Sequence, residues 1–138
     1  MALPGPLVLS NKVVPRFNPG RHLMDGDSLN IIGAMVGSNE SGKTATAGGG
    51  RAAAYPIVAA LTQFSTVATG GDSCVLPAAV PGMECTIQND GAASLQVFAN
   101  GSDTINATAG ATGVALANGA TAMYKCVVAG GWKRFVSA

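Results

Sequence analysis

The chain has 138 residues, of which 48% are hydrophobic, 5% aromatic and 11% charged, and its formal net charge is +1. This length is typical of one domain that buries roughly two-thirds of the surface its unfolded chain would expose, so a core can form without metals or disulfides. The chain has neither a basic stripe with interleaved aromatics nor an apolar run of roughly 20 residues, which argues against nucleic-acid and membrane partners.

Residues 1–50 are expected to form an extended arm rich in Pro and Gly. Prolines at positions 4, 6, 15 and 19 fix φ and remove backbone donors, which disfavours a helix. The apolar run at residues 29–36 is the one segment of the arm in which we expect a strand. Residues 3–9 are too short and too broken by proline to predict a signal peptide, so we expect synthesis in the cytoplasm.

A phosphate-loop pattern lies at residues 37–44. Their sequence, GSNESGKT, matches G-x-x-x-x-G-K-[ST], in which backbone amides and the lysine hold a nucleotide's phosphates and the hydroxyl binds magnesium. Such a loop must open a helix. Residues 45–51 instead contain three consecutive glycines, each of which costs a helix about 1 kcal/mol. We therefore expect a flexible polar linker, with nucleotide binding as the alternative.

Residues 51–138 show the rhythm of a small all-β domain, in which short apolar runs alternate with clusters of Gly, Pro, Asn and Asp. Residues 83–88 alternate Met, Cys and Ile with Glu, Thr and Gln, which predicts a buried and an exposed set. Residues 89–91, Asn-Asp-Gly, predict a hairpin-type turn, and residues 130–131 are expected to join the last two strands. The expected strands cover residues 57–67, 74–76, 83–88, 95–97, 104–105, 114–116, 122–128 and 132–136.

This pattern predicts an antiparallel, jelly-roll-like β-sandwich over residues 51–138, preceded by the extended arm. Residues 57–61 fit a helical turn as well as the start of a strand. Cys74, Cys85 and Cys126 form no C-x-x-C pair, so we expect buried free thiols rather than a zinc or redox site.

No set of catalytic side chains accompanies the predicted strands. The one histidine, His22, lies in the arm, and most of the carboxylates at residues 72, 84, 90 and 103 lie in turns, where Asp has a local structural role. Asp25 and Asp27 resemble the start of a calcium loop, but Val36 stands where the closing acid is required. We expect no enzymatic activity, no cofactor and no metal.

Three aromatic residues are candidates for the core or for a subunit interface. Trp132, Tyr124 and Phe98 are large apolar side chains in a chain with few aromatics, and such side chains stabilise most when they are buried. Stacking of a ligand on Trp132 is the alternative.

The later part of the chain resembles a known class of proteins. The resemblance covers about residues 56–138 and rests on AALT at 59–62, VLPAAVPG at 75–82, IQNDG at 87–91, LQVF at 95–98, GSDTIN at 101–106 and the final GGW. These segments resemble the small β-sandwich domains of tailed-bacteriophage virion proteins, most closely the capsid decoration (cement) proteins.

The resemblance implies a homotrimer on the exterior of the capsid that stabilises the joints between major capsid proteins. Sparse charge agrees with a subunit whose faces are covered in an assembly. The arm is then the expected capsid-contacting part, with Arg16, Phe17, Arg21 and His22 as its most adhesive side chains. The alternative is a head or tail fibre or spike module whose loops at 77–82 or 100–103 contact the host surface.

Overall fold

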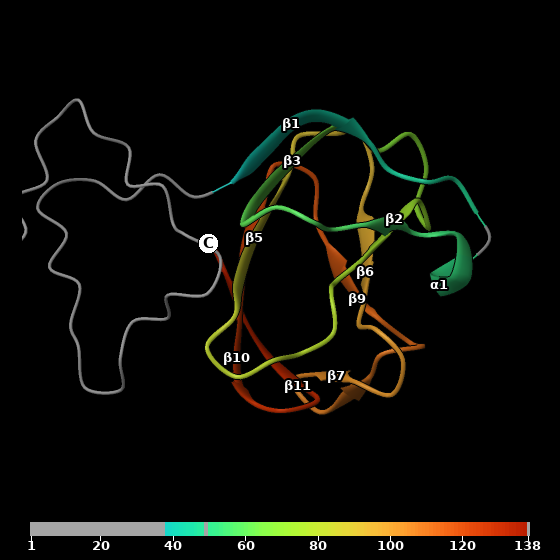
Figure 1. Ribbon diagram of the computed structural model, residues 1–138. Helices are drawn as coiled ribbons and strands as arrows, with labels where there is room; N and C mark the ends of the chain where they lie inside the picture. The colour runs from blue at the N-terminus through green and yellow to red at the C-terminus, as the bar shows by residue number, and fades with distance from the viewer. Residues whose placement is uncertain (1–37, 49, 138) are drawn as a thin grey trace, which may run out of the picture. The chain divides into compact units, whose positions relative to one another are not determined.

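The computed structural model describes residues 38–48 and 50–137, and these residues form two β-sheets around one core (Figure 1). The predicted all-β class is confirmed. Among the described residues the one helix is α1 (Gly50–Ala53), a single turn. The strand predicted at 29–36 lies outside the described residues.

The two sheets differ in size. The large sheet has seven strands in the order β1 (Asn39–Thr44), β3 (Leu61–Thr66), β5 (Glu84–Asn89), β10 (Thr121–Val128), β11 (Gly131–Val136), β7 (Thr104–Ile105) and β8 (Thr108–Ala109). The small sheet has four strands in the order β2 (Tyr55–Pro56), β4 (Ser73–Val75), β6 (Leu95–Phe98) and β9 (Val114–Leu116).

The first six strands wind as a short solenoid-like coil. The chain alternates between the sheets, so that β1, β3 and β5 stack in parallel in the large sheet while β2, β4 and β6 stack in parallel in the small one. The later strands then pair antiparallel with the end of this coil, β9 with β6 and β10 with β5. The sheets are therefore mixed.

The antiparallel prediction is right for the pairs β5–β10, β6–β9, β10–β11 and β7–β8, and wrong for the coil and for β7 with β11, which pair in parallel. Residues 89–91 do not form a hairpin, because they carry the chain from β5 in the large sheet to β6 in the small one. The Asn89 side chain turns inward: its Nδ2 donates to the carbonyls of Ala93 and Leu116, each at 2.9 Å, and its Oδ1 accepts from Gly91 N at 3.0 Å. The predicted hairpin at residues 130–131 is confirmed between β10 and β11.

Residues 39–44, interpreted from sequence as part of a flexible linker, form the edge strand β1, so that interpretation is wrong. A bulge between Glu40 and Lys43 fits this polar segment to β3. Gly42 supplies the positive φ of 68° and donates its amide to Gln63 Oε1 at 2.8 Å. The unit that the structure describes thus begins before residue 51, where the sequence placed the start of the sandwich domain.

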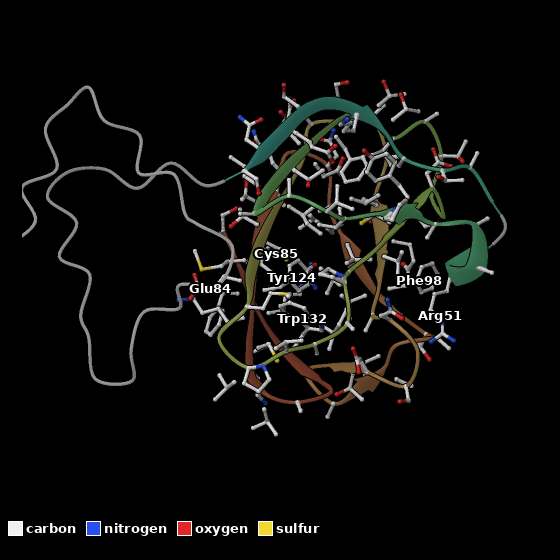
Figure 2. The ribbon with its side chains drawn as sticks, in the orientation of Figure 1. Arg51, Glu84, Cys85, Phe98, Tyr124 and Trp132 are labelled. Atoms are coloured by element: carbon white, nitrogen blue, oxygen red, sulfur yellow. The ribbon has the colours of Figure 1, made fainter. Side chains whose placement is uncertain are left out.

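The core lies between the two sheets (Figure 2). Trp132 and Tyr124 from the large sheet are fully enclosed there, and Phe98 at the end of β6 is also buried. Of the two alternatives given for these aromatics, the structure places Trp132 and Tyr124 in the core of the single chain. Phe98 is buried but lies outside that core, because it follows the inward-facing Val97 on β6 and points to the opposite face of the small sheet. Cys85 and Ile87 face inward while Glu84, Thr86 and Gln88 face outward, which confirms the alternation predicted for this strand.

The three cysteines are buried free thiols, as expected. Burial raises the pKa of Cys74 and of Cys85, so both remain protonated thiols at neutral pH. They fill space as small apolar side chains.

Candidate interaction surface

The outer face of the large sheet carries its side chains in rows. Glu84, Thr86 and Gln88 of β5 point outward, and their register partners on neighbouring strands extend each of them into a row across the sheet. A row runs perpendicular to the strands, because residues in register lie side by side about 4.8 Å apart. The outer face therefore consists of three parallel rows of side chains, one through each of these residues.

The central row is apolar apart from one threonine. Leu61 on β3 is in register with Thr86 on β5, Thr86 with Met123 on β10, and Met123 with Phe135 on β11. Leu61 and Met123 are each 40% exposed and Phe135 is 58% exposed. Large apolar side chains aligned in this way mark an interaction surface more often than single exposed ones do. We call Leu61, Thr86, Met123 and Phe135 the apolar row.

One flank of the apolar row is basic. Glu84, Lys125 and Lys133 lie side by side on β5, β10 and β11, and Lys125 Nζ lies 2.9 Å from Glu84 Oε1. Among the described residues Lys133 has no ion-pair partner. This flank therefore carries one uncompensated positive charge.

The other flank is acidic. Gln63 on β3 and Gln88 on β5 lie in register, and both donate to the carboxylate of Asp90, Gln63 Nε2 at 2.7 Å and Gln88 Nε2 at 3.0 Å. The amides hold this exposed carboxylate at the outer face. The apolar row thus lies between a lysine-bearing edge and an aspartate-bearing edge.

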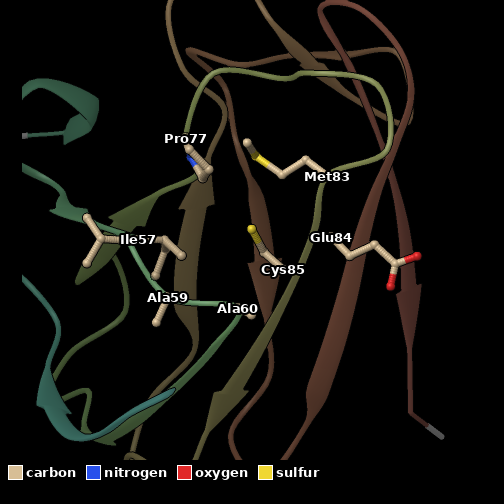
Figure 3. Close-up of a pocket in the computed structure, with 8 residues that line it drawn as sticks. Ile57, Ala59, Ala60, Pro77, Met83, Glu84 and Cys85 are labelled. Carbon is tan, nitrogen blue, oxygen red and sulfur yellow. The ribbon is translucent and has the colours of Figure 1, made fainter. Parts of the chain in front are cut away.

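An apolar pocket of about 220 Å³ lies where the β2–β3 and β4–β5 crossovers meet (Figure 3). Its lining consists of Ile57, Val58, Ala59, Ala60, Pro77, Met83, Glu84 and Cys85. Ligand pockets usually enclose about 300–1,000 Å³ and hold a few convergent polar groups. Here the Glu84 carboxylate turns away from the pocket and pairs with Lys125, so the pocket presents mainly apolar walls.

The phosphate-loop pattern does not have the geometry of a phosphate loop in residues 38–48, because its lysine belongs to an edge strand. Lys43 Nζ lies 3.1 Å from Glu40 Oε1 and 5.9 Å from the centre of the Tyr55 ring. The hydrogen bond to Glu40, followed by that to Tyr55, raises the pKa of Lys43. The ammonium group of Lys43 therefore contacts Glu40 and Tyr55 of the same chain instead of pointing into a phosphate-binding loop.

The residues singled out from sequence as capsid-contacting, Arg16, Phe17, Arg21 and His22, lie outside the described residues. The apolar row was not predicted. The signal was present, however, because a strand that buries Tyr124 must point Met123 outward, and one that buries Trp132 must point Phe135 outward.

In the part of the chain that the structure describes, no group of three or more His, Cys, Asp or Glu side chains is placed to hold a metal ion. No helix among these residues is both long and apolar enough to cross a membrane. No protein family, curated protein or solved structure matches this chain.

Proposed function

We propose that the protein is a structural virion protein, which binds the exterior of a phage capsid as a homotrimer and stabilises the joints between major capsid proteins. The proposal begins from the resemblance of residues 56–138 to capsid decoration proteins. The observation that carries it is the apolar row, because a face of this kind suits a subunit that works inside an assembly.

Burial of the apolar row would favour association. Full burial of a Leu, Met or Phe side chain stabilises by about 1.5–3 kcal/mol. In the single chain Leu61, Met123 and Phe135 are still 40–58% exposed. Each would therefore contribute on the order of 1 kcal/mol when a second protein covers it. Contributions of this size are weak singly and become effective when several chains are joined.

The arm supplies the second part of the proposal. In a trimer, three arms attach to the capsid at once, so the second and third contacts form at high effective concentration. Arg16, Phe17, Arg21 and His22 are the residues that we assign to this contact. They combine positive charge with aromatic surface, and arginine in particular is enriched at binding hot spots.

The finer description of the fold is part of the same proposal. Two sheets that enclose one core are a sandwich arrangement, and the antiparallel pairs β5–β10 and β6–β9 agree with a jelly-roll-like later half. The parallel coil of the first six strands is a departure from that pattern.

Co-sedimentation of the full chain with capsids that lack it tests the proposal. We expect saturable binding, with a bound amount that levels off at a fixed number of chains per capsid. Replacement of Arg16, Phe17, Arg21 and His22 by alanine should reduce this binding while the far-ultraviolet spectrum of the protein stays unchanged. Absence of wild-type binding to capsids contradicts the proposal.

A fibre or spike module is the second candidate, and one observation favours it. Val80, Val127 and Val128 are exposed, and Gly82 N donates to Cys126 O at 2.9 Å, which holds the loop between β4 and β5 against the end of β10. Exposed apolar side chains of this kind suit contact with a host surface. Binding to host cells that Val80→Asp abolishes, together with no binding to capsids, would favour this candidate.

A further inference from the structure

We propose that the apolar row is the face through which copies of this chain associate, with an axis of symmetry that runs parallel to the row. The lysine-bearing flank of one copy then meets the Asp90 flank of the next. The number of copies, three, rests on the proposed function. The surface and the direction of the axis rest on the geometry of the large sheet and on the charges of its two flanks.

The row has the right extent for such a contact. It crosses four adjacent strands, from Leu61 on β3 to Phe135 on β11, which corresponds to about 14 Å at the usual spacing between strands. Met123 and Phe135 also line a shallow depression whose other walls come from Thr86, Thr121, Val136 and Ser137. A matching row from a second copy would cover both side chains.

Charge selects a second copy of this chain as the occupant. One flank of the row bears Lys133, free of any ion pair within the described residues, and the other bears the exposed carboxylate of Asp90. The chain thus carries a positive and a negative charge on opposite sides of one apolar row. A copy of the same chain supplies the missing partner of each half.

The arrangement of the flanks also fixes the direction of the axis. Rotation about an axis parallel to the row brings opposite flanks of neighbouring copies together, so that the flank bearing Lys133 faces the flank bearing Asp90. Because such a rotation keeps each residue at its own position along the row, Lys133 on β11 and Asp90 beside β5 lie about two strand spacings, roughly 10 Å, apart and attract each other over that distance. Rotation about an axis parallel to the strands leaves the position of each row along the strand direction unchanged. Lysine flanks would then meet lysine flanks, and like charges in contact oppose association.

The solution mass of the full chain and of variants at the centre of the row tests the surface. We expect wild type to sediment as an oligomer and Phe135→Glu to sediment as a single chain at the same concentration. Val58→Glu is the matched control, because Val58 is 75% exposed, more than Phe135, and lies outside the row. We expect it to keep the wild-type mass. A circular dichroism melt of each variant verifies that the chain is folded.

Charge reversal tests the axis and does not depend on Phe135. Lys133→Glu and Asp90→Lys should each raise the concentration of half-dissociation a few-fold, because each gives the two facing flanks a charge of the same sign. The double variant, with the two charges exchanged, should return this concentration close to the wild-type value. Failure of the double variant to recover overturns the proposed direction of the axis.

A wild-type chain that sediments as a single chain overturns the inference, and so does an oligomer whose mass Phe135→Glu leaves unchanged. The capsid experiment separates this failure from failure of the proposed function. Capsid binding by an oligomer that is insensitive to Phe135→Glu preserves the function and rejects the surface. An oligomer that depends on the row but ignores capsids supports the surface and rejects the function.

Discussion

Met123 and Phe135 lie directly opposite each other on β10 and β11, and both side chains point away from the core. Tyr124 and Trp132, on the same two strands, point inward and are fully buried. Each strand thus divides its apolar side chains between the core and the outer face. The division explains how one sheet can both close the fold and offer a surface for association.

Asn89→Ala should destabilise the fold strongly. The buried Asn89 amide donates to the carbonyls of Ala93, Leu116 and Ala117, and its oxygen accepts from Gly91 N. Its removal leaves these buried groups without partners, which costs about 1–3 kcal/mol in the free energy of unfolding. Urea unfolding followed by circular dichroism measures the change. Asn100→Ala, in an exposed turn, is the control and should change this free energy by less than about 0.5 kcal/mol.

Gly91→Ala should also destabilise the fold, because the backbone passes close to another loop at this point. A Cβ on Gly91 would lie 2.3 Å from Val67 N and 2.5 Å from Val67 Cβ. Overpacking of this kind costs about 1–3 kcal/mol or more. Gly70→Ala is the matched control, since a Cβ there meets no atom within 4 Å. Equal melting temperatures for the two variants would contradict the close approach.

Asp72 should make stability depend on pH in the acid range. Hydrogen bonds from the Thr69 hydroxyl, from Thr69 N and from Ala68 N lower the pKa of this carboxyl. A carboxyl with a lower pKa in the folded state stabilises the fold above its unfolded pKa of about 3.9, and this contribution is lost as the pH falls through the folded pKa.

The melting temperature of wild type should therefore fall between pH 6 and pH 2.5 by more than that of Asp72→Asn, which cannot ionise at this position. Differential scanning calorimetry at several pH values measures both slopes. Parallel slopes for the two proteins would show that Asp72 does not contribute.

Lys43→Ala separates the phosphate-loop hypothesis from the structural role of β1. Because Lys43 contacts Glu40 and Tyr55, we expect a slightly lower melting temperature and no other change. Mg²⁺-ATP should leave the melting temperature of wild type and of the variant unaltered, since a ligand stabilises only the state that it binds. A rise in wild type that Lys43→Ala abolishes would restore the nucleotide-binding alternative.

Local patterns in the sequence predicted the local structure well. The strands expected at residues 104–105 and 114–116 have the same bounds in the structure, and the alternation at 83–88 divides buried from exposed side chains correctly. Strand β1 was missed because its sequence, NESGKT, shows no apolar alternation. It forms through backbone bonds to β3 and a bulge at Gly42, neither of which has a clear signal in a polar segment.

The order of the strands could not be predicted in the same way. Asn-Asp-Gly at residues 89–91 suits a hairpin and suits equally the crossover that the structure contains, because both need a tight turn. The choice depends on where β3 and β10 lie, which is a non-local property. The apolar row has the same character, since its four residues come from four strands and meet only in the folded sheet.

The most direct test of the proposed capsid-binding function is the number of chains bound per capsid at saturation, measured by co-sedimentation of the full chain with capsids that lack it. We predict saturable binding with a number of chains that is a multiple of three, and a loss of binding when the four arm residues are replaced by alanine. Absent or non-saturable binding to the capsid would contradict the proposed function.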